Sequence, residues 1–243
     1  MNEQHHITSA FDRDLESVQA KVMKMGGLVE DSIRKGSRAL KRLDIELGEQ
    51  VRREDRAIDA LDEEINLECA RILAIRQPAA SDLRTVLSVM HISSNLERIG
   101  DYAKNMGKRT GALAQMPQIE GSGGAVKRMA KEVQHMLADA LDAYIRRDEA
   151  LAQDVRHRDL EVDQMYNALF REFLTFMMED PRSISACMHL HFIAKNIERM
   201  GDHVTAIADQ AIYLVTGDMP DEARPKGNAE PYQVPEDAAP DGA

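Results

Sequence analysis

A seven-residue pattern occurs twice in this chain, as NLERIGD at 95–101 and as NIERMGD at 196–202. The Asn, Glu, Arg, Gly and Asp are kept, whereas the apolar positions change between Leu, Ile and Met. On a helix, residues four apart lie on one face, about 6 Å apart along the axis. The repeat therefore predicts two functional carboxylate pairs, Glu97 with Asp101 and Glu198 with Asp202.

Two more acidic pairs with the same spacing precede the repeated pattern, one in each half of the chain. They are Asp55 with Asp59, and Asp159 with Asp163. If their helices run antiparallel to those of the repeated pattern, up to four carboxylates converge around one point in each half. Oxygen ligands without thiols suit Mg, Ca, Mn or Fe better than a structural zinc site. We therefore expect bound metal in each half, with its identity open among iron, manganese, magnesium and zinc.

The same residues also allow a purely structural interpretation. Acidic residues four apart are common on solvated helix faces, and Arg98 or Arg199 could neutralise a carboxylate in place of a metal. Gly100 and Gly201 lie within helices, where Gly is about 0.5 to 1 kcal/mol less favourable than Ala. Each Gly indicates either close approach of a helix or ligand, or tight packing alone. Duplication of the polar set favours a binding role.

A ferritin-like di-iron site is the alternative chemistry that the spacing of acids and histidines suggests. The candidate pairs are Glu132 with His135, and Asp154 with His157. The first pair falls on the outward side of its helix, and the second pair has Asp where the motif has Glu, so we disfavour this interpretation. His203 follows Asp202, but Tyr102 fills the matching position of the first half, so His203 is not included among the ligands.

The elements that must position these residues are helices. Apolar residues recur every three or four positions from Leu15 to Gly217, as in amphipathic helices. Aromatic residues make up only 4% of the chain and Trp is absent, which favours an all-α protein. We expect six helices: from about Leu15 to 47, from after Gly48 to Pro78, from about Ser81 to before Pro117, over 126–144, over 149–178, and from near Pro181 to Gly217.

The repeat divides this all-α chain into two tandem, antiparallel three-helix bundles. Residues 117–124 are rich in Gly, Pro and Ser and predict a linker. The last segment, 218–243, contains five of the eight prolines and seven acidic residues, which predicts a disordered acidic tail. The expected domains are therefore 1–116 and 125–217, joined by that linker.

Charge and cysteine content exclude several classes of protein. A net charge of -11 and a pI near 5.2 argue against a dedicated nucleic-acid binder. Cys69 and Cys187 form no CxxC spacing, the start of the chain lacks a signal-peptide pattern, and no apolar run approaches 18 residues. We expect a cytoplasmic protein that meets a membrane only through partner proteins.

The first helix carries one dense basic patch. It consists of Arg34, Lys35, Arg38, Lys41 and Arg42. A solvated face balanced by acids on other helices is the favoured interpretation, and docking of a partner is the alternative.

A tandem three-helix repeat with NLERIGD in one half and NIERMGD in the other resembles the PhoU family, regulators of bacterial phosphate uptake. The resemblance spans about residues 8–216 and implies two similar bundles, often a homodimer, that bind metal ions through ExxxD and DxxxD faces. Glu97, Asp101, Glu198 and Asp202 match the repeated motif. Asp55, Asp59, Asp159 and Asp163 match the acids of the preceding helices.

The resemblance also implies a regulatory role. The expected partners are the phosphate ABC transporter, through its ATPase subunit, and the phosphate-sensing histidine kinase. We expect a non-enzymatic, metal-binding adaptor that negatively regulates phosphate import and the phosphate-starvation response. The alternative is a carboxylate-bridged di-metal enzyme on a helical bundle.

Overall fold

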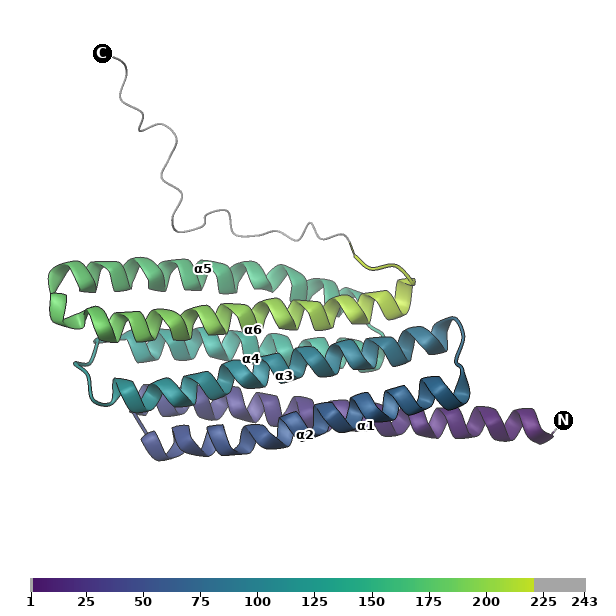
Figure 1. Ribbon diagram of the computed structural model, residues 1–243. Coiled ribbons are helices and arrows are strands. Elements are labelled where there is room, and N and C mark those ends of the chain that lie inside the picture. The colour runs from purple at the N-terminus through teal and green to yellow at the C-terminus, as the bar shows by residue number, and fades with distance from the viewer. Residues whose placement is uncertain (1, 221–243) are drawn as a thin grey trace, which may run out of the picture.

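The computed structural model describes residues 2–220, with side chains from Ala10 onward, so most of the predicted tail lies outside the described residues. The described part is all-α, as predicted (Figure 1). Its six α-helices are α1 (Asn2–Arg42), α2 (Ile45–Arg76), α3 (Ser81–Leu113), α4 (Ser122–Arg146), α5 (Glu149–Glu179) and α6 (Ile184–Thr216). A single 3-10 turn, Pro181–Ser183, precedes α6.

The turn between α1 and α2 lies before Gly48, so the prediction of a helix boundary at Gly48 was wrong. Asp44 ends the turn after α1, and its side chain accepts a hydrogen bond from the Leu47 backbone N–H, 3.0 Å away. With this N-cap, α2 begins at Ile45, three residues before Gly48. Asp148 caps α5 in the same way through Leu151. Aspartates at equivalent turns therefore start the second helix of each bundle.

Gly48 lies inside α2 because two helix backbones come together there. A Cβ built on Gly48 would lie 2.8 Å from the carbonyl oxygen of Gly107, and a Cβ on Gly107 would lie 2.5 Å from the Gly48 oxygen. Both values are far below van der Waals contact. The two glycines thus allow α2 and α3 to pack backbone to backbone, and they fix the register of this antiparallel pair.

The two bundles share one continuous core, although the sequence predicted them as separate domains. Helices α1 to α3 form one bundle and α4 to α6 the other, and they lie side by side in Figure 1. Contacts between α3 and α6 and between α1 and α4 join them. Buried apolar side chains from all six helices form a single cluster. None of the described helices is both long enough and apolar enough to cross a membrane.

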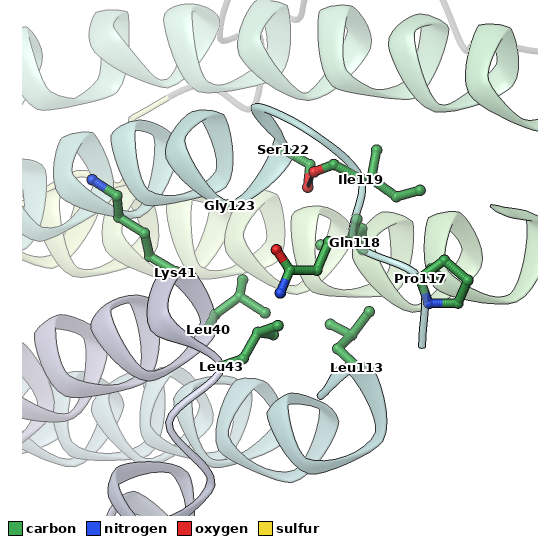
Figure 2. A pocket seen from close by; sticks show the side chains of 11 residues that line it. Leu40, Lys41, Leu43, Leu113, Pro117, Gln118, Ile119, Ser122 and Gly123 are labelled. Atoms are coloured by element: carbon green, nitrogen blue, oxygen red, sulfur yellow. Dashed lines mark hydrogen bonds between the residues drawn. The ribbon is translucent and has the colours of Figure 1, made fainter. Parts of the chain in front are cut away.

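The predicted linker at 117–124 is shorter in the structure, because α4 already begins at Ser122. Figure 2 shows Pro117, Gln118 and Ile119 passing over Leu40 and Leu113 at the ends of α1 and α3. The pocket left between them has a volume of about 80 Å³. That volume is well below the roughly 300 Å³ at which ligand pockets begin, so this site serves to seat the linker.

Candidate metal centre

The first acidic cluster forms where α2 crosses the repeated motif of α3. Asp55 of α2 is only 1% exposed and lies next to Gly100. Lys104 Nζ lies 2.5 Å from Asp55 Oδ2 and 3.1 Å from Asp101 Oδ1. The other oxygen of this aspartate, Oδ1, has no hydrogen-bond partner among the described residues. A lysine therefore joins acids from two helices and leaves one buried oxygen unsatisfied.

Electrostatic coupling extends this cluster to the other predicted residues of the first half. Burial raises the pKa of Asp55; the neighbouring lysine opposes this, and Asp59 and Asp101 add to it. Burial also raises the pKa of Glu97, followed by repulsion from Asp101, while Arg98 opposes the shift. Asp59, Glu97 and Asp101 therefore lie within electrostatic range of one another or of Asp55, the fourth acid that the sequence assigned to this half.

The second cluster lies at the matching crossing of α5 and α6. Asp159 is 3% exposed and lies against Gly201. Glu198 accepts a hydrogen bond from Lys195 Nζ at 2.8 Å through Oε1, whereas its buried Oε2 has no hydrogen-bond partner within the described part of the chain. Burial raises the pKa of Glu198; Lys195 opposes this, and Asp202 and Asp163 reinforce it.

The glycine of the repeated motif makes room for the acidic helix. A Cβ on Gly201 would lie 2.7 Å from Asp159 Oδ1. At Gly100 it would lie 3.1 Å from the Ile58 side chain and 3.5 Å from Asp55 Oδ1. Of the two interpretations that the sequence left open, close approach of a neighbouring helix therefore applies, and the approaching group in both bundles includes a buried carboxylate.

Each cluster contains a lysine that sequence reasoning missed. Lys104 follows Asp101 by three residues, and Lys195 precedes Glu198 by three, so each lies beside its acid on the same helix face. That i,i+3 spacing is the signal that could have identified them. The repeat does not conserve these lysines, because Thr205 and Ser94 fill the matching positions.

The carboxylate oxygens of the two clusters are the kind of ligand that a hard cation prefers, but their spacing in the structure fits a cation less well. Both clusters offer carboxylate oxygens, and each has a buried oxygen, on Asp55 and on Glu198, that no described residue hydrogen-bonds. Between residues 2 and 220, however, no three His, Cys, Asp or Glu side chains are grouped closely enough to hold a metal ion. Lysine ammonium groups supply the positive charge that the structure places beside these acids.

The two motifs meet at the contact between α3 and α6. His203 Nδ1 lies 2.8 Å from Asn95 Oδ1, and the rings of His203 and Tyr102 are 5.7 Å apart. Burial lowers the pKa of this histidine; Asp202 opposes the shift, and Arg98 and Arg199 reinforce it. In the first copy of the motif, Asp101 therefore lies beside α2 through Lys104, while Asn95 contacts α6 of the other bundle.

The alternative pairs on α4 and α5 do not form a di-iron site. Glu132 and Asp154 both pair with Arg158, at 3.8 and 3.2 Å. His157 Nδ1 lies 2.7 Å from the backbone oxygen of Gln153. These acids are thus engaged by a guanidinium group rather than turned toward the histidines.

Comparison with known proteins agrees with this duplicated architecture. The family described as "PhoU domain" matches the chain twice, over residues 22–110 and 126–211. The chain belongs to the PhoU family. Each matched range runs from within the first helix of one bundle to within its third helix and contains one copy of the repeated motif.

Relatives in the PhoU family cover most of the chain. A protein of Rhizobium meliloti (strain 1021), named phosphate-specific transport system accessory protein PhoU homolog, is 42% identical over 228 residues, covering 91% of this chain and 93% of that protein. A homolog of the same name from Caulobacter vibrioides (strain NA1000 / CB15N) is 43% identical, with 91% and 96% covered.

Two crystal structures show the same fold. PhoU from Pseudomonas aeruginosa superimposes with a TM-score of 0.83 at 41% identity, covering 86% of this chain and 100% of that one. The phosphate transport system regulatory protein PhoU from Streptococcus pneumoniae gives 0.80 at 32% identity, covering 87% and 99%.

Proposed function

We propose that this protein is a non-catalytic, metal-binding adaptor that regulates phosphate uptake. The observation that carries the proposal is the duplicated carboxylate cluster, built at the same helix crossing in both copies of the PhoU domain. The printed names of its relatives, accessory and regulatory proteins of phosphate transport, support the physiological role. They also support a regulator over the alternative of a carboxylate-bridged enzyme.

The proposed action is negative regulation. In this proposal the protein works in the cytoplasm as a homodimer, restrains the phosphate ABC transporter through its ATPase subunit, and signals to the phosphate-sensing histidine kinase. When phosphate is ample, both import and the starvation response are held low. This part of the proposal rests on the family, whose members carry the accessory role in their names.

Metal would be held by oxygen atoms of the two acidic clusters. The first set is Asp55, Asp59, Glu97 and Asp101, and the second is Asp159, Asp163, Glu198 and Asp202. A bound cation would neutralise carboxylates whose pKa burial has raised, notably Glu97 and Glu198. It would thereby tie the second helix of each bundle to the third.

Deletion of the gene tests the regulatory role. In phosphate-rich medium, the deletion strain is expected to take up more phosphate and to express starvation genes that the parent keeps silent. Complementation with the wild-type gene restores both values. Unchanged uptake and unchanged expression in the deletion strain would contradict the proposed function.

Metal content tests the clusters separately. The variant Glu198→Ala with Asp202→Ala is expected to lose the metal of the second bundle, measured by elemental analysis after dialysis against iron, manganese, magnesium or zinc. Glu161→Ala with Glu172→Ala removes two exposed acids from α5 and serves as the charge-matched control. Circular dichroism checks that both variants stay helical. Equal metal content in the two variants would count against these ligands.

A further inference from the structure

A groove between α1 and α4 gathers basic side chains. It has a volume of about 440 Å³. Its lining residues are Arg34, Ser37, Arg38, Lys127, Lys131, Gln134 and His135. Four of these seven are permanently cationic, and none is acidic. In a chain of net charge -11, this is a local reversal of sign.

The antiparallel packing of α1 and α4 creates this concentration of charge. Leu141 packs over Gly26 at one end of the contact, and Lys41 packs beside Gly123 at the other. This register places Arg34 and Arg38 of α1 in the same groove as Lys127 and Lys131 of α4, which are distant in the sequence. The four side chains are exposed, so their charges are available to a ligand.

Nearby acids are mostly engaged elsewhere. On α4, Glu132 and Asp139 pair with Arg158 of α5, at 3.8 and 2.5 Å. On α1, Asp31 pairs with Arg34 and also lies 2.7 Å from Lys35. Among the described residues, Arg38, Lys127 and Lys131 have no carboxylate within ion-pair distance. Three of the four cations therefore have no counterion within residues 10–220.

The internal repeat does not account for the four basic residues of the groove, because the matching positions of the other domain copy are not basic. The two domain copies begin at residues 22 and 126, which aligns Arg34 with Ala138 and Arg38 with Asp142. By the same alignment, Lys127 and Lys131 correspond to Met23 and Gly27. The basic set thus occupies one end of the contact between α1 and α4 and is absent from the related positions.

We propose that this groove binds a small anion that carries a chain of phosphate groups. Arginine forks and lysine ammonium groups are the standard partners of phosphate oxygens. The Gln134 amide and the His135 ring can donate further hydrogen bonds. The volume lies in the range of small-molecule pockets and exceeds the needs of one inorganic phosphate. A concave site of this kind suits a compact polyanion better than a flat lipid surface.

This assignment revises the interpretation of the basic patch on α1. Lys35 is turned to Glu54, 2.7 Å away, so it belongs to the solvated, balanced face that the sequence favoured. Arg34 and Arg38 instead line the groove. The patch is therefore divided between two faces of the same helix, and only one of them is proposed to bind a ligand.

Isothermal titration calorimetry with sodium tripolyphosphate tests the proposal. The wild-type protein is expected to bind tripolyphosphate more tightly than sulfate at equal ionic strength. Arg38→Gln with Lys131→Gln is expected to weaken tripolyphosphate binding at least tenfold. The control Arg53→Gln with Lys108→Gln removes the same charge from exposed positions outside the groove and is expected to bind as the wild type does.

Three further measurements sharpen the outcome. ATP and tripolyphosphate compared at equal concentration distinguish a nucleotide from a free polyphosphate, because both carry the recognised chain. Asp101→Asn, in the acidic cluster, is expected to leave tripolyphosphate binding unchanged, which separates this site from the proposed metal centre. Thermal unfolding of each variant confirms that it is folded. Equal weakening in both double variants, or binding only to anionic phospholipid vesicles, overturns the proposal.

Discussion

The carboxylate of Asp159 occupies the space that a side chain on Gly201 would need, since a Cβ there would lie 2.7 Å from Asp159 Oδ1. The aspartate is 3% exposed and comes from α5, whereas the glycine belongs to the repeated motif of α6. Conservation of the glycine within the repeat thus has a geometric cause. The motif carries its own acids and also admits one from the neighbouring helix.

Gly201→Ala is expected to destabilise the protein more than Gly100→Ala. At Gly201 the new methyl group collides with a buried carboxylate, which should lower the free energy of unfolding by about 1 to 3 kcal/mol. At Gly100 the nearest atom is 3.1 Å away in the flexible Ile58 side chain, and the roughly 1 kcal/mol gain in helix propensity offsets the crowding. Urea unfolding followed by circular dichroism measures both. Equal losses would contradict the geometry.

Gly107→Ala is expected to destabilise strongly, by about 3 kcal/mol, because its Cβ would meet the Gly48 backbone, which cannot rotate away as a side chain can. Gly111→Ala in the same helix is the matched control. Apart from the backbone of α3 itself, no atom of the described residues lies within 4 Å of a Cβ at Gly111, so alanine there should stabilise by about 0.5 to 1 kcal/mol. Thermal unfolding of the two variants should move the midpoint in opposite directions.

Glu198→Gln is expected to stabilise the metal-free protein at pH 7. Burial raises the folded-state pKa of Glu198 above its ordinary value, so the ionised side chain opposes folding at neutral pH. The neutral amide removes that penalty while its oxygen can still accept from Lys195. As the pH falls through the folded pKa toward the unfolded value of about 4.3, wild-type Glu198 is protonated and the advantage disappears.

Urea unfolding with a chelator present, at intervals from pH 7.5 to pH 4, measures this difference. The exposed Glu161→Gln on α5 is the control and should show a much smaller dependence on pH. A stability difference for Glu198→Gln that grows toward acid pH would show that the buried carboxylate favours folding, contrary to this expectation.

Lys104→Met is expected to increase metal binding by the first cluster. The ammonium group lies within 3.1 Å of both Asp55 and Asp101, so it competes with any cation for the same oxygens. Without metal, the variant should be less stable by about 1 to 3 kcal/mol, because Asp55 is left buried without its charge partner. Manganese titration by calorimetry and urea unfolding measure the two effects. Reduced manganese affinity would indicate that Lys104 organises the cluster.

The all-α class and the repeated organisation were predictable from sequence because they depend on local patterns. Apolar periodicity, with Pro78 and Pro181 as breaks, marked most helix ends to within a few residues, although α1 begins at Asn2 rather than near Leu15. A further difference concerns Gly48, which by its residue type alone predicts the end of a helix. Its true role depends on Gly107, a partner 59 positions later in the printed sequence, and no local pattern reports such a contact.

The sequence by itself determined which acids are repeated and on which helix faces they lie, because the period of an α-helix fixes those faces. Only the tertiary structure decided what meets them. Packing of α2 on α3 placed the buried Asp55 beside Lys104, and packing of α5 on α6 placed the buried Asp159 against Gly201. Packing of α1 against α4 likewise joined cations about 90 residues apart into one groove. Such encounters depend on register and crossing between helices, which are fixed by the shapes of buried side chains across the whole core.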